Sequence, residues 1–338
     1  MLEKPDLPDE CLVACLQEAY GLRIDGVSFL PLGADFSAAV YRVVARDGRS
    51  YFVKLRRGRF DEVSVILPKL LHDQGVTQVI PPIATKTGQL WTHLDDHHLI
   101  LYSFVEGGNG FEVELAPHDW SELGTALRRI HTVTLPAEIR QRIPQESYTP
   151  RWRNTLKVFL DEVEKKEYAD PDAAQLAALL RAKRSELEHV IARSEALSRV
   201  VQAKALPFVL CHTDIHSWNL LLEHNGGLYI VDWDMPMLSP KERDLMFLVD
   251  GVGGIWQGTD GDAQFYEGYG GARADPVALA YYRYERGIED IVVTAEQIFL
   301  TKEGGTDRAE GIQHLLTAFS PGGAIALAYR SDPLERRR

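Results

Sequence analysis

The chain has 338 residues, of which 45% are hydrophobic and 25% charged, and its formal net charge is −12. Because this length exceeds one ordinary core, we expect two domains or lobes. The negative charge argues against binding nucleic acid or an anionic membrane through a broad basic face. Residues 1–10 lack the apolar core of a signal peptide, and no run of about 18 apolar residues occurs, so we expect a cytoplasmic protein.

The first third of the chain has the pattern of a small β-rich lobe. A helix is expected over residues 7–20, and a second over 61–74, where Gly75 ends it. Asp47 and Gly48 stand between two runs of β-branched and aromatic residues, which is a strong hairpin signal. The expected strands are short and lie at 27–32, 38–45, 50–55, 90–94 and 98–105.

After residues 104–110 the pattern changes to long helices. Four apolar residues of one such helix share a stripe at helical spacing, namely Trp120, Leu123, Leu127 and Ile130. Further helices are expected over 150–167, 172–201 and 276–300. We therefore predict an α+β fold with two lobes, a nucleotide-binding lobe over 1–105 that ends in a hinge and a mostly helical lobe over 106–338.

A hairpin interrupts the helical part and has the sequence VLCHTDIHSWNLLLEHNGGLYIVDWD, residues 209–234. Asp214 and Asn219 lie between its two predicted strands, and Asp232 follows the second. Two carboxylates and a carboxamide grouped in this way need a cation between them. In phosphoryl transfer, an Asp orients and deprotonates the acceptor hydroxyl, while an Asn and a second Asp hold Mg²⁺ against the nucleotide phosphates. The hairpin therefore predicts Mg²⁺-dependent transfer from ATP, with Asp214 as the base.

The β-rich lobe offers groups for the nucleotide phosphates. Lys54 lies in a strand of alternating apolar positions, and Glu62, near the start of the next helix, is placed to pair with it. A surface lysine and a helix-start acid would give the same pattern. Gly33 and Ser37 belong to a loop between two strands whose backbone amides could reach a phosphate, although the loop lacks G-x-G-x-x-G.

These motifs resemble the aminoglycoside phosphotransferase family, which shares the protein-kinase fold, over essentially the full length. Segments such as VLCHTDIHSWNLLL, YIVDWDMPMLSPKERDLMF and YYRYERGIEDI look most like the branch that phosphorylates the 9-hydroxyl of spectinomycin. Many members have Gly where Thr213 stands, and a small residue where Trp218 stands, so Trp218 is either core packing or a wall of the acceptor site. The resemblance implies these roles: Asp214 as base, Asn219 and Asp232 as metal ligands, Lys54 and Glu62 as the phosphate pair, backbone groups at Ser103 and Val105 for adenine, and His212 and Asp244 as supports of the loop.

The acceptor site is less sharply defined by the sequence. A helical stripe of aromatic and acidic residues within YYRYERGIED could receive an amine, although salt bridges on a solvated helix would look the same. Asp234 directly follows the metal-binding region and is open to three interpretations: an acceptor contact, a neighbour of the metal or a turn cap. The residues expected to border the acceptor are Asp234, Glu242, Trp256, Tyr269, Tyr281 and Glu285.

We therefore predict an enzyme that transfers a phosphoryl group from ATP to a hydroxyl of a cationic aminocyclitol or aminoglycoside antibiotic, with spectinomycin as the leading acceptor. A small-metabolite kinase that acts on an amino alcohol, a sugar or a homoserine-like compound is the main alternative. An inactive kinase fold is disfavoured, because Lys54, Asp214, Asn219 and Asp232 are all present. We expect a monomer or a weak dimer.

Overall fold

The computed structural model describes residues 4–33, 37–58, 60–248, 261–301, 305–320, 323–333 and 335. The predicted α+β class is confirmed, with an N-terminal β-sheet and a larger helical part. The chain divides into two compact units: unit 1 comprises Met1–Leu115, Val133–Ile143 and Ser217–Pro236, and unit 2 comprises Ala116–Thr132, Pro144–His216 and Met237–Arg338. This division differs from a single boundary at the hinge, because the second half of the catalytic hairpin belongs to unit 1.

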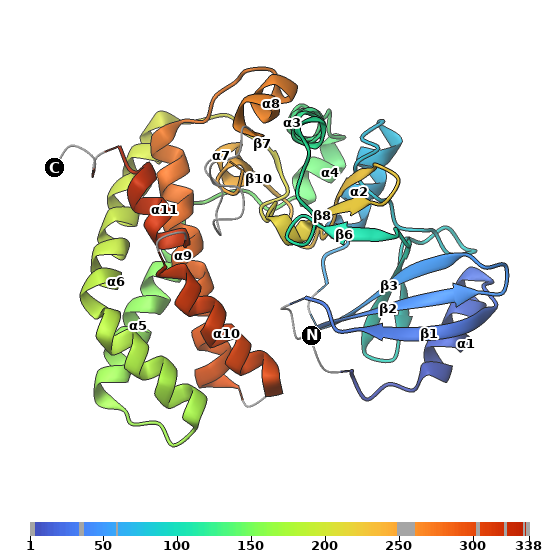
Figure 1. The fold of residues 1–338 in the computed structure, drawn as a ribbon, viewed down its shortest axis with the longest axis horizontal. Coiled ribbons are helices and arrows are strands. Elements are labelled where there is room, and N and C mark those ends of the chain that lie inside the picture. The colour runs from blue at the N-terminus through green and yellow to red at the C-terminus, as the bar shows by residue number, and fades with distance from the viewer. Residues whose placement is uncertain are drawn as a thin grey trace. The chain divides into compact units, whose positions relative to one another are not determined.

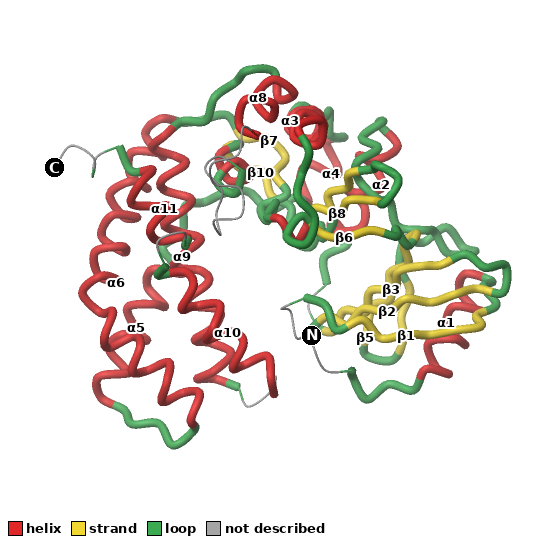
Figure 2. Tube along the Cα trace, in the orientation of Figure 1, coloured by secondary structure: helices red, strands yellow, loops and turns green. Residues whose placement is uncertain are grey.

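Unit 1 is built on a five-stranded antiparallel sheet (Figures 1 and 2). Its strands, in spatial order, are β1 (Ile24–Leu30), β2 (Ala38–Ala45), β3 (Ser50–Arg57), β5 (His97–Ser103) and β4 (Thr92–Leu94). Helix α1 (Asp9–Tyr20) packs on one face, where Leu12 and Leu16 meet Val53 and Leu55 of β3 in the core. Because side chains alternate along a strand, Lys54 lies on the opposite face. Full burial of each such leucine contributes about 1.5–3 kcal/mol.

A second, three-stranded sheet of unit 1 carries the later half of the hairpin at residues 209–234. It joins β6 (Gly107–Asn109), β8 (Leu220–Glu223) and β9 (Leu228–Ile230), and a short 3₁₀ turn, η1 (Ser217–Asn219), leads into β8. The amide of Ile230 donates to the carbonyl of Gln78, 2.7 Å away, which ties this sheet to the loop after α2 (Val63–Asp73). A short helix, α4 (Ala137–Arg142), completes the unit.

Unit 2 is mostly helical (Figure 1). Helix α9 (Pro276–Leu300) packs against α5 (Arg151–Lys165), α6 (Pro171–Lys204), α10 (Gly305–Ala318) and α11 (Ala324–Ser331). Helices α3 (Pro117–His131) and α8 (Gly261–Tyr269) approach closely at Gly124, where a Cβ atom would lie 2.1 Å from the carbonyl oxygen of Phe265. Strands β7 (Phe208–Cys211) and β10 (Met237–Pro240) pair antiparallel, and the one-turn helix α7 (Glu242–Leu245) follows. Among the described residues, no helix is both long and apolar enough to cross a bilayer.

Candidate active site

Lys54, which is predicted to bind the nucleotide phosphates, lies in a cluster of charges within unit 1. Its ammonium lies 2.7 Å from Asp232 Oδ1 and 2.7 Å from Asp234 Oδ2, and Arg56 of the same strand face also forms an ion pair with Asp234. Burial alone would lower the pKa of Lys54, but the two carboxylates outweigh burial and raise it. Lys54 is therefore held as a cation, and Asp234 is a neighbour of the predicted metal ligand.

The turn that presents these carboxylates follows β9. Asp232 adopts a left-handed backbone conformation with φ 68°, which an aspartate tolerates better than most residues. Trp233 is buried, and its indole N–H donates to the carbonyl of Ile230 at 3.1 Å. This anchor holds the turn while both flanking aspartates contact Lys54. Burial raises the pKa of the Asp234 carboxyl, and the charge of Asp232 acts in the same direction, against Lys54 and Arg56.

Asn219 and Asp232 supply the oxygen donors that Mg²⁺ prefers. The amide of Val231, next to Asp232 in the chain, donates to the carbonyl of Asn219 at 3.0 Å. This bond brings the ends of β8 and β9 together, with a carboxamide on one strand end and a carboxylate beyond the other. The donor chemistry of the two residues therefore fits a hard divalent cation.

The ion pair predicted between Lys54 and Glu62 is wrong. Glu62 directly precedes α2, and its carboxylate accepts from the guanidinium of Arg142 in α4 at 2.8 Å. Lys54 already contacts two carboxylates of the D-W-D turn. The sequence pattern places Glu62 near the strand that carries Lys54. It cannot predict the contact with Arg142, because that residue lies 80 positions further along the chain.

The residues predicted to border the nucleotide lie as follows. Gly33 has φ 85°, and the carbonyl of Ser37 accepts from the amide of Arg57 at 2.8 Å; Asp35, between them, falls outside the described residues. Ser103 ends β5 opposite Tyr51, and Val105 lies two residues further on. Their contacts with nucleotide remain predictions.

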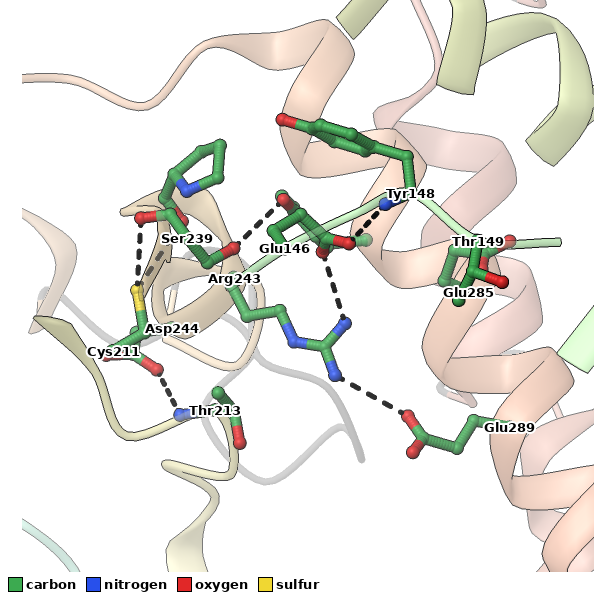
Figure 3. A network of polar contacts seen from close by, with 12 residues as sticks. Glu146, Tyr148, Thr149, Cys211, Thr213, Ser239, Arg243, Asp244, Glu285 and Glu289 are labelled. Atoms are coloured by element: carbon green, nitrogen blue, oxygen red, sulfur yellow. Dashed lines mark hydrogen bonds and ion pairs between the residues drawn. The ribbon is translucent and has the colours of Figure 1, made fainter. Parts of the chain in front are cut away.

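Asp244 holds the first half of the catalytic loop, in unit 2. Its fully buried carboxylate accepts from the amide of Thr213 at 2.6 Å (Figure 3) and from the amide of His212 at 3.0 Å. His131 bridges the same carboxylate, at 3.0 Å, to the hydroxyl of Tyr269, at 2.6 Å. Thr213 has φ 78°, a strained conformation for a β-branched residue. Two charge-assisted hydrogen bonds from its own and the preceding amide offset that strain, so Asp244 fixes the backbone that enters Asp214.

Asp214 is engaged on both carboxylate oxygens. Arg286 of α9 donates to Oδ1 at 2.7 Å, and the Nε2 atom of His216 lies 3.4 Å from Oδ2. The Asp214 amide donates to Nδ1 of His212 at 3.3 Å. Burial would raise the pKa of this carboxyl, but Arg286 and His216 outweigh burial and lower it well below its usual range. Asp214 is therefore held in the deprotonated form that a general base needs.

Arg286 is the functional contact that sequence reasoning missed. Its guanidinium joins Asp214 to Asp290, whose carboxylate lies 2.8 Å from Nε one turn further along α9. Burial raises the pKa of Asp290 to about 6, although Arg286 opposes the shift. The YYRYERGIED pattern contains both residues at the i,i+4 spacing of a helical ion pair. That spacing indicates an ion pair between Arg286 and Asp290, but it does not show that Arg286 also contacts Asp214.

Four residues predicted to contact the acceptor are buried, with exposed fractions between 2% and 6%. They have partners within unit 2: Glu242 accepts from the amide of Asp275, Tyr269 contacts His131, Tyr281 packs on Tyr148 and Tyr282, and Glu285 contacts Ser194 and Arg153. The structure thus places these side chains inside unit 2 instead of at an open surface, and their contacts with an acceptor stay a prediction. Trp256 lies outside the described residues.

The neighbouring acid on α9, Glu289, also belongs to an internal network. Its carboxylate lies 3.8 Å from Arg243, and that guanidinium lies 3.9 Å from Glu146 (Figure 3). Burial would lower the pKa of Arg243, but Glu289 and Glu146 outweigh burial and raise it. The acidic stripe of α9 therefore stabilises the helical unit from within.

Comparison with known proteins identifies the family. The profile of the phosphotransferase enzyme family matches residues 28–282. A spectinomycin phosphotransferase, solved with ADP and spectinomycin, is 34% identical with a TM-score of 0.88; the alignment covers 97% of this chain and 99% of that one. Its AMP complex gives a TM-score of 0.83 at 34% identity, covering 95% and 98%. An aminoglycoside phosphotransferase from Alicyclobacillus acidocaldarius shares the fold at 16% identity, with a TM-score of 0.64 and coverage of 99% and 98%.

No curated relative matches the chain. The profile nevertheless spans Lys54, the whole catalytic loop and the D-W-D turn, and the spectinomycin phosphotransferase aligns over both units. The chain thus belongs to the phosphotransferase enzyme family that includes the aminoglycoside phosphotransferases, and it acts on hydroxyl groups.

Proposed function

We propose that the protein phosphorylates a hydroxyl of an aminocyclitol antibiotic with ATP, and that spectinomycin is its acceptor. The observation that carries this proposal is the 34% identity to a spectinomycin phosphotransferase across 97% of the chain. The aminoglycoside phosphotransferase from Alicyclobacillus acidocaldarius shares the fold at only 16% identity. We place the reaction in the cytoplasm, where ATP is available, and its consequence is resistance to the drug.

The donor side of the reaction belongs to unit 1. The ammonium of Lys54 would position the nucleotide phosphates. When a nucleotide binds, contacts between this ammonium and phosphate oxygens would replace its contacts with Asp232 and Asp234. Asn219 and Asp232 would hold Mg²⁺, which offsets the negative charge of the phosphates. The backbone at Ser103 and Val105 would bind adenine, and Gly33 and Ser37 would flank the phosphates.

On the acceptor side, Asp214 receives the proton. The acceptor oxygen forms a bond to the γ-phosphorus, the bond from that phosphorus to the ADP oxygen breaks, and the hydroxyl proton passes to the Asp214 carboxylate. Because such transition states are loose, the enzyme mainly orients the hydroxyl and stabilises charge. A carboxylate whose proton affinity is lowered by Arg286 suits that task, since it remains a hydrogen-bond acceptor at every working pH.

A small-metabolite kinase is the second candidate. One observation favours it: the acids of α9 that suggested a cationic acceptor are buried against Arg153 and Arg243. Without those acids, α9 supplies no charge that requires a cationic acceptor, and the chemistry of Asp214 would serve the hydroxyl of a sugar or a homoserine-like compound equally well.

A panel assay separates the candidates. Purified enzyme with Mg²⁺ and ATP is offered spectinomycin, kanamycin, choline, homoserine and a free sugar, and ADP release is followed by a coupled assay, with Asp214→Asn as the matched inactive control. In parallel, drug-sensitive bacteria that express each protein are grown on spectinomycin and kanamycin. We expect acceptor-dependent ADP release with spectinomycin and growth that depends on Asp214. Turnover of a metabolite without any response to spectinomycin would transfer the assignment to the second candidate.

A further inference from the structure

Two aromatic side chains of unit 1 form an exposed stack beside the catalytic loop. The rings of Phe111 and Trp218 lie 4.6 Å apart between centroids, with only 15° between their planes. Each residue is 52% exposed. Trp218 is therefore not a core residue, whereas Trp233 of the same hairpin is buried.

The stack is held by backbone contacts on both sides. The amide of Gly110 lies 2.9 Å from the carbonyl oxygen of Ser217 and 2.8 Å from that of Leu220, and it donates to both. A Cβ atom at Gly110 would lie 3.0 Å from the Ser217 oxygen, so the approach of the two segments favours glycine. On the other side, the carboxamide oxygen of Asn109 accepts from the Phe111 amide at 3.0 Å. These bonds preorganise the two rings.

The stack has a defined place relative to the chemistry. Trp218 immediately precedes Asn219, the predicted metal ligand, and both residues belong to unit 1. An acceptor whose hydroxyl approaches a phosphate held at that metal can extend its remaining rings to the indole. Val113, Glu112 and Glu114, which follow Phe111 closely in the chain, are also exposed.

We propose that the Phe111–Trp218 stack is the platform on which the acceptor's ring system lies, and that it selects a compact ring compound bearing an amine. The inference rests on the proposed function and identifies a binding subsite for it. Aromatic faces attract the apolar faces of saturated rings and also attract ammonium groups through the ring quadrupole. The carboxylates of Glu112 and Glu114 add attraction for a cation. An uncharged sugar gains only the ring contact, so the platform discriminates in favour of amines.

Steady-state kinetics of Trp218→Ala, Phe111→Ala and Trp218→Phe test the platform. We expect the alanine variants to raise KM for spectinomycin by about 3–30-fold, the equivalent of one close cation–ring contact, with kcat and the KM for ATP within about twofold of wild type. Trp218→Phe should retain most of the affinity, because it keeps an aromatic face. Val158→Ala, at a residue 54% exposed on α5, is the matched surface control and should change nothing.

Several results would overturn the platform. One is an unchanged acceptor KM; another is a raised KM for ATP instead, which would assign the stack to the nucleotide. A change in molar mass by sedimentation in Trp218→Ala would assign the stack to contact with a second copy. Thermal melting checks that each variant is folded, and Trp218→Phe replaces Trp218→Ala if the alanine variant is not. If the wild type prefers another acceptor of the panel, the same KM ratios are measured with that compound, so that an error in the substrate stays distinguishable from an error in the platform.

Discussion

Replacing Arg286 with glutamine removes the charge that keeps Asp214 ionised. In the native site the guanidinium lies 2.7 Å from Asp214 Oδ1, while burial acts in the opposite direction. Glutamine keeps a side-chain hydrogen-bond donor but is shorter than arginine, so Arg286→Lys, which is also shorter but keeps the charge, is the matched control. The pKa of Asp214 should therefore rise from below its usual range to its usual range or above.

The size of this rise follows from Coulomb's law. Two unit charges roughly 4 Å apart interact by about 4 kcal/mol at an effective dielectric constant of 20. Since the side chains of Asp214 and Arg286 are 27% and 21% exposed, water screens part of this interaction, and we take about half. One pKa unit corresponds to about 1.36 kcal/mol, so the loss of Arg286 should raise the pKa of Asp214 by roughly 1.5, toward its usual range.

The assay is the pH profile of kcat/KM for the acceptor. Asp214 must be deprotonated to act, so a depressed pKa keeps the active form present down to strongly acidic pH, and a raised pKa removes that form as pH falls through it. We expect the acid limb of Arg286→Gln to lie at a higher pH than the acid limbs of the wild type and of Arg286→Lys. An identical acid limb in the wild type and Arg286→Gln would refute the reasoning.

Asp290 requires its own control, because its pKa is raised to about 6 and it loses its partner in the variant. The double variant Arg286→Gln/Asp290→Asn removes both charges. The shifted limb should persist there if it belongs to Asp214. Asp290→Asn alone identifies any limb near pH 6 that originates at Asp290 itself.

Three further predictions concern the two halves of the hairpin. Asp214→Asn keeps the shape but not the base, so turnover should fall by about 10²–10⁴-fold while nucleotide affinity, measured by calorimetry, barely changes; near-normal turnover would remove Asp214 from the chemistry. Asp232→Ala should weaken Mg²⁺-dependent ATP binding and turnover together, and Asn219→Ala should do so less, because a neutral ligand contributes less charge; intact Mg·ATP binding in Asp232→Ala would place the metal elsewhere. Asp244→Ala removes the buried carboxylate to which two backbone amides and His131 are hydrogen-bonded. The free energy of unfolding, measured with urea, should therefore fall by about 2–4 kcal/mol. An unchanged urea midpoint would contradict the role of Asp244 in holding the loop.

Local pattern was enough for the parts of the fold that depend on neighbours in sequence. Alternation along residues 50–55 placed Lys54 on one sheet face, because the side-chain period of a strand is two. The Asp47-Gly48 pair set the hairpin between β2 and β3. The helical stripe that begins at Trp120 became α3, with its apolar side buried.

The errors came from contacts made across long stretches of chain. Periodicity gave the faces of α9 but not the helices that cover them, so Tyr281 and Glu285 were expected at a surface. For the same reason Glu62 was assigned to Lys54 when the fold brings Arg142 to it. Arg286 was visible only as half of an i,i+4 pair, since its contact with Asp214 spans 72 residues.

The charges around Lys54 have a consequence for the order in which ligands arrive. Lys54 and Arg56 form ion pairs with Asp232 and Asp234, so two cations and two anions already neutralise one another. Free Mg²⁺ would have to compete with Lys54 for the carboxylate of Asp232, and its charge would be repelled by Lys54 and Arg56. A nucleotide that brings both the metal and phosphate oxygens compensates all of these charges at once. The site is therefore expected to take up the metal as part of Mg·ATP and to bind the free ion weakly, which calorimetry with Mg²⁺ alone would contradict by showing tight binding. Fluctuations in free Mg²⁺ would then alter this enzyme only through the amount of Mg·ATP available to it.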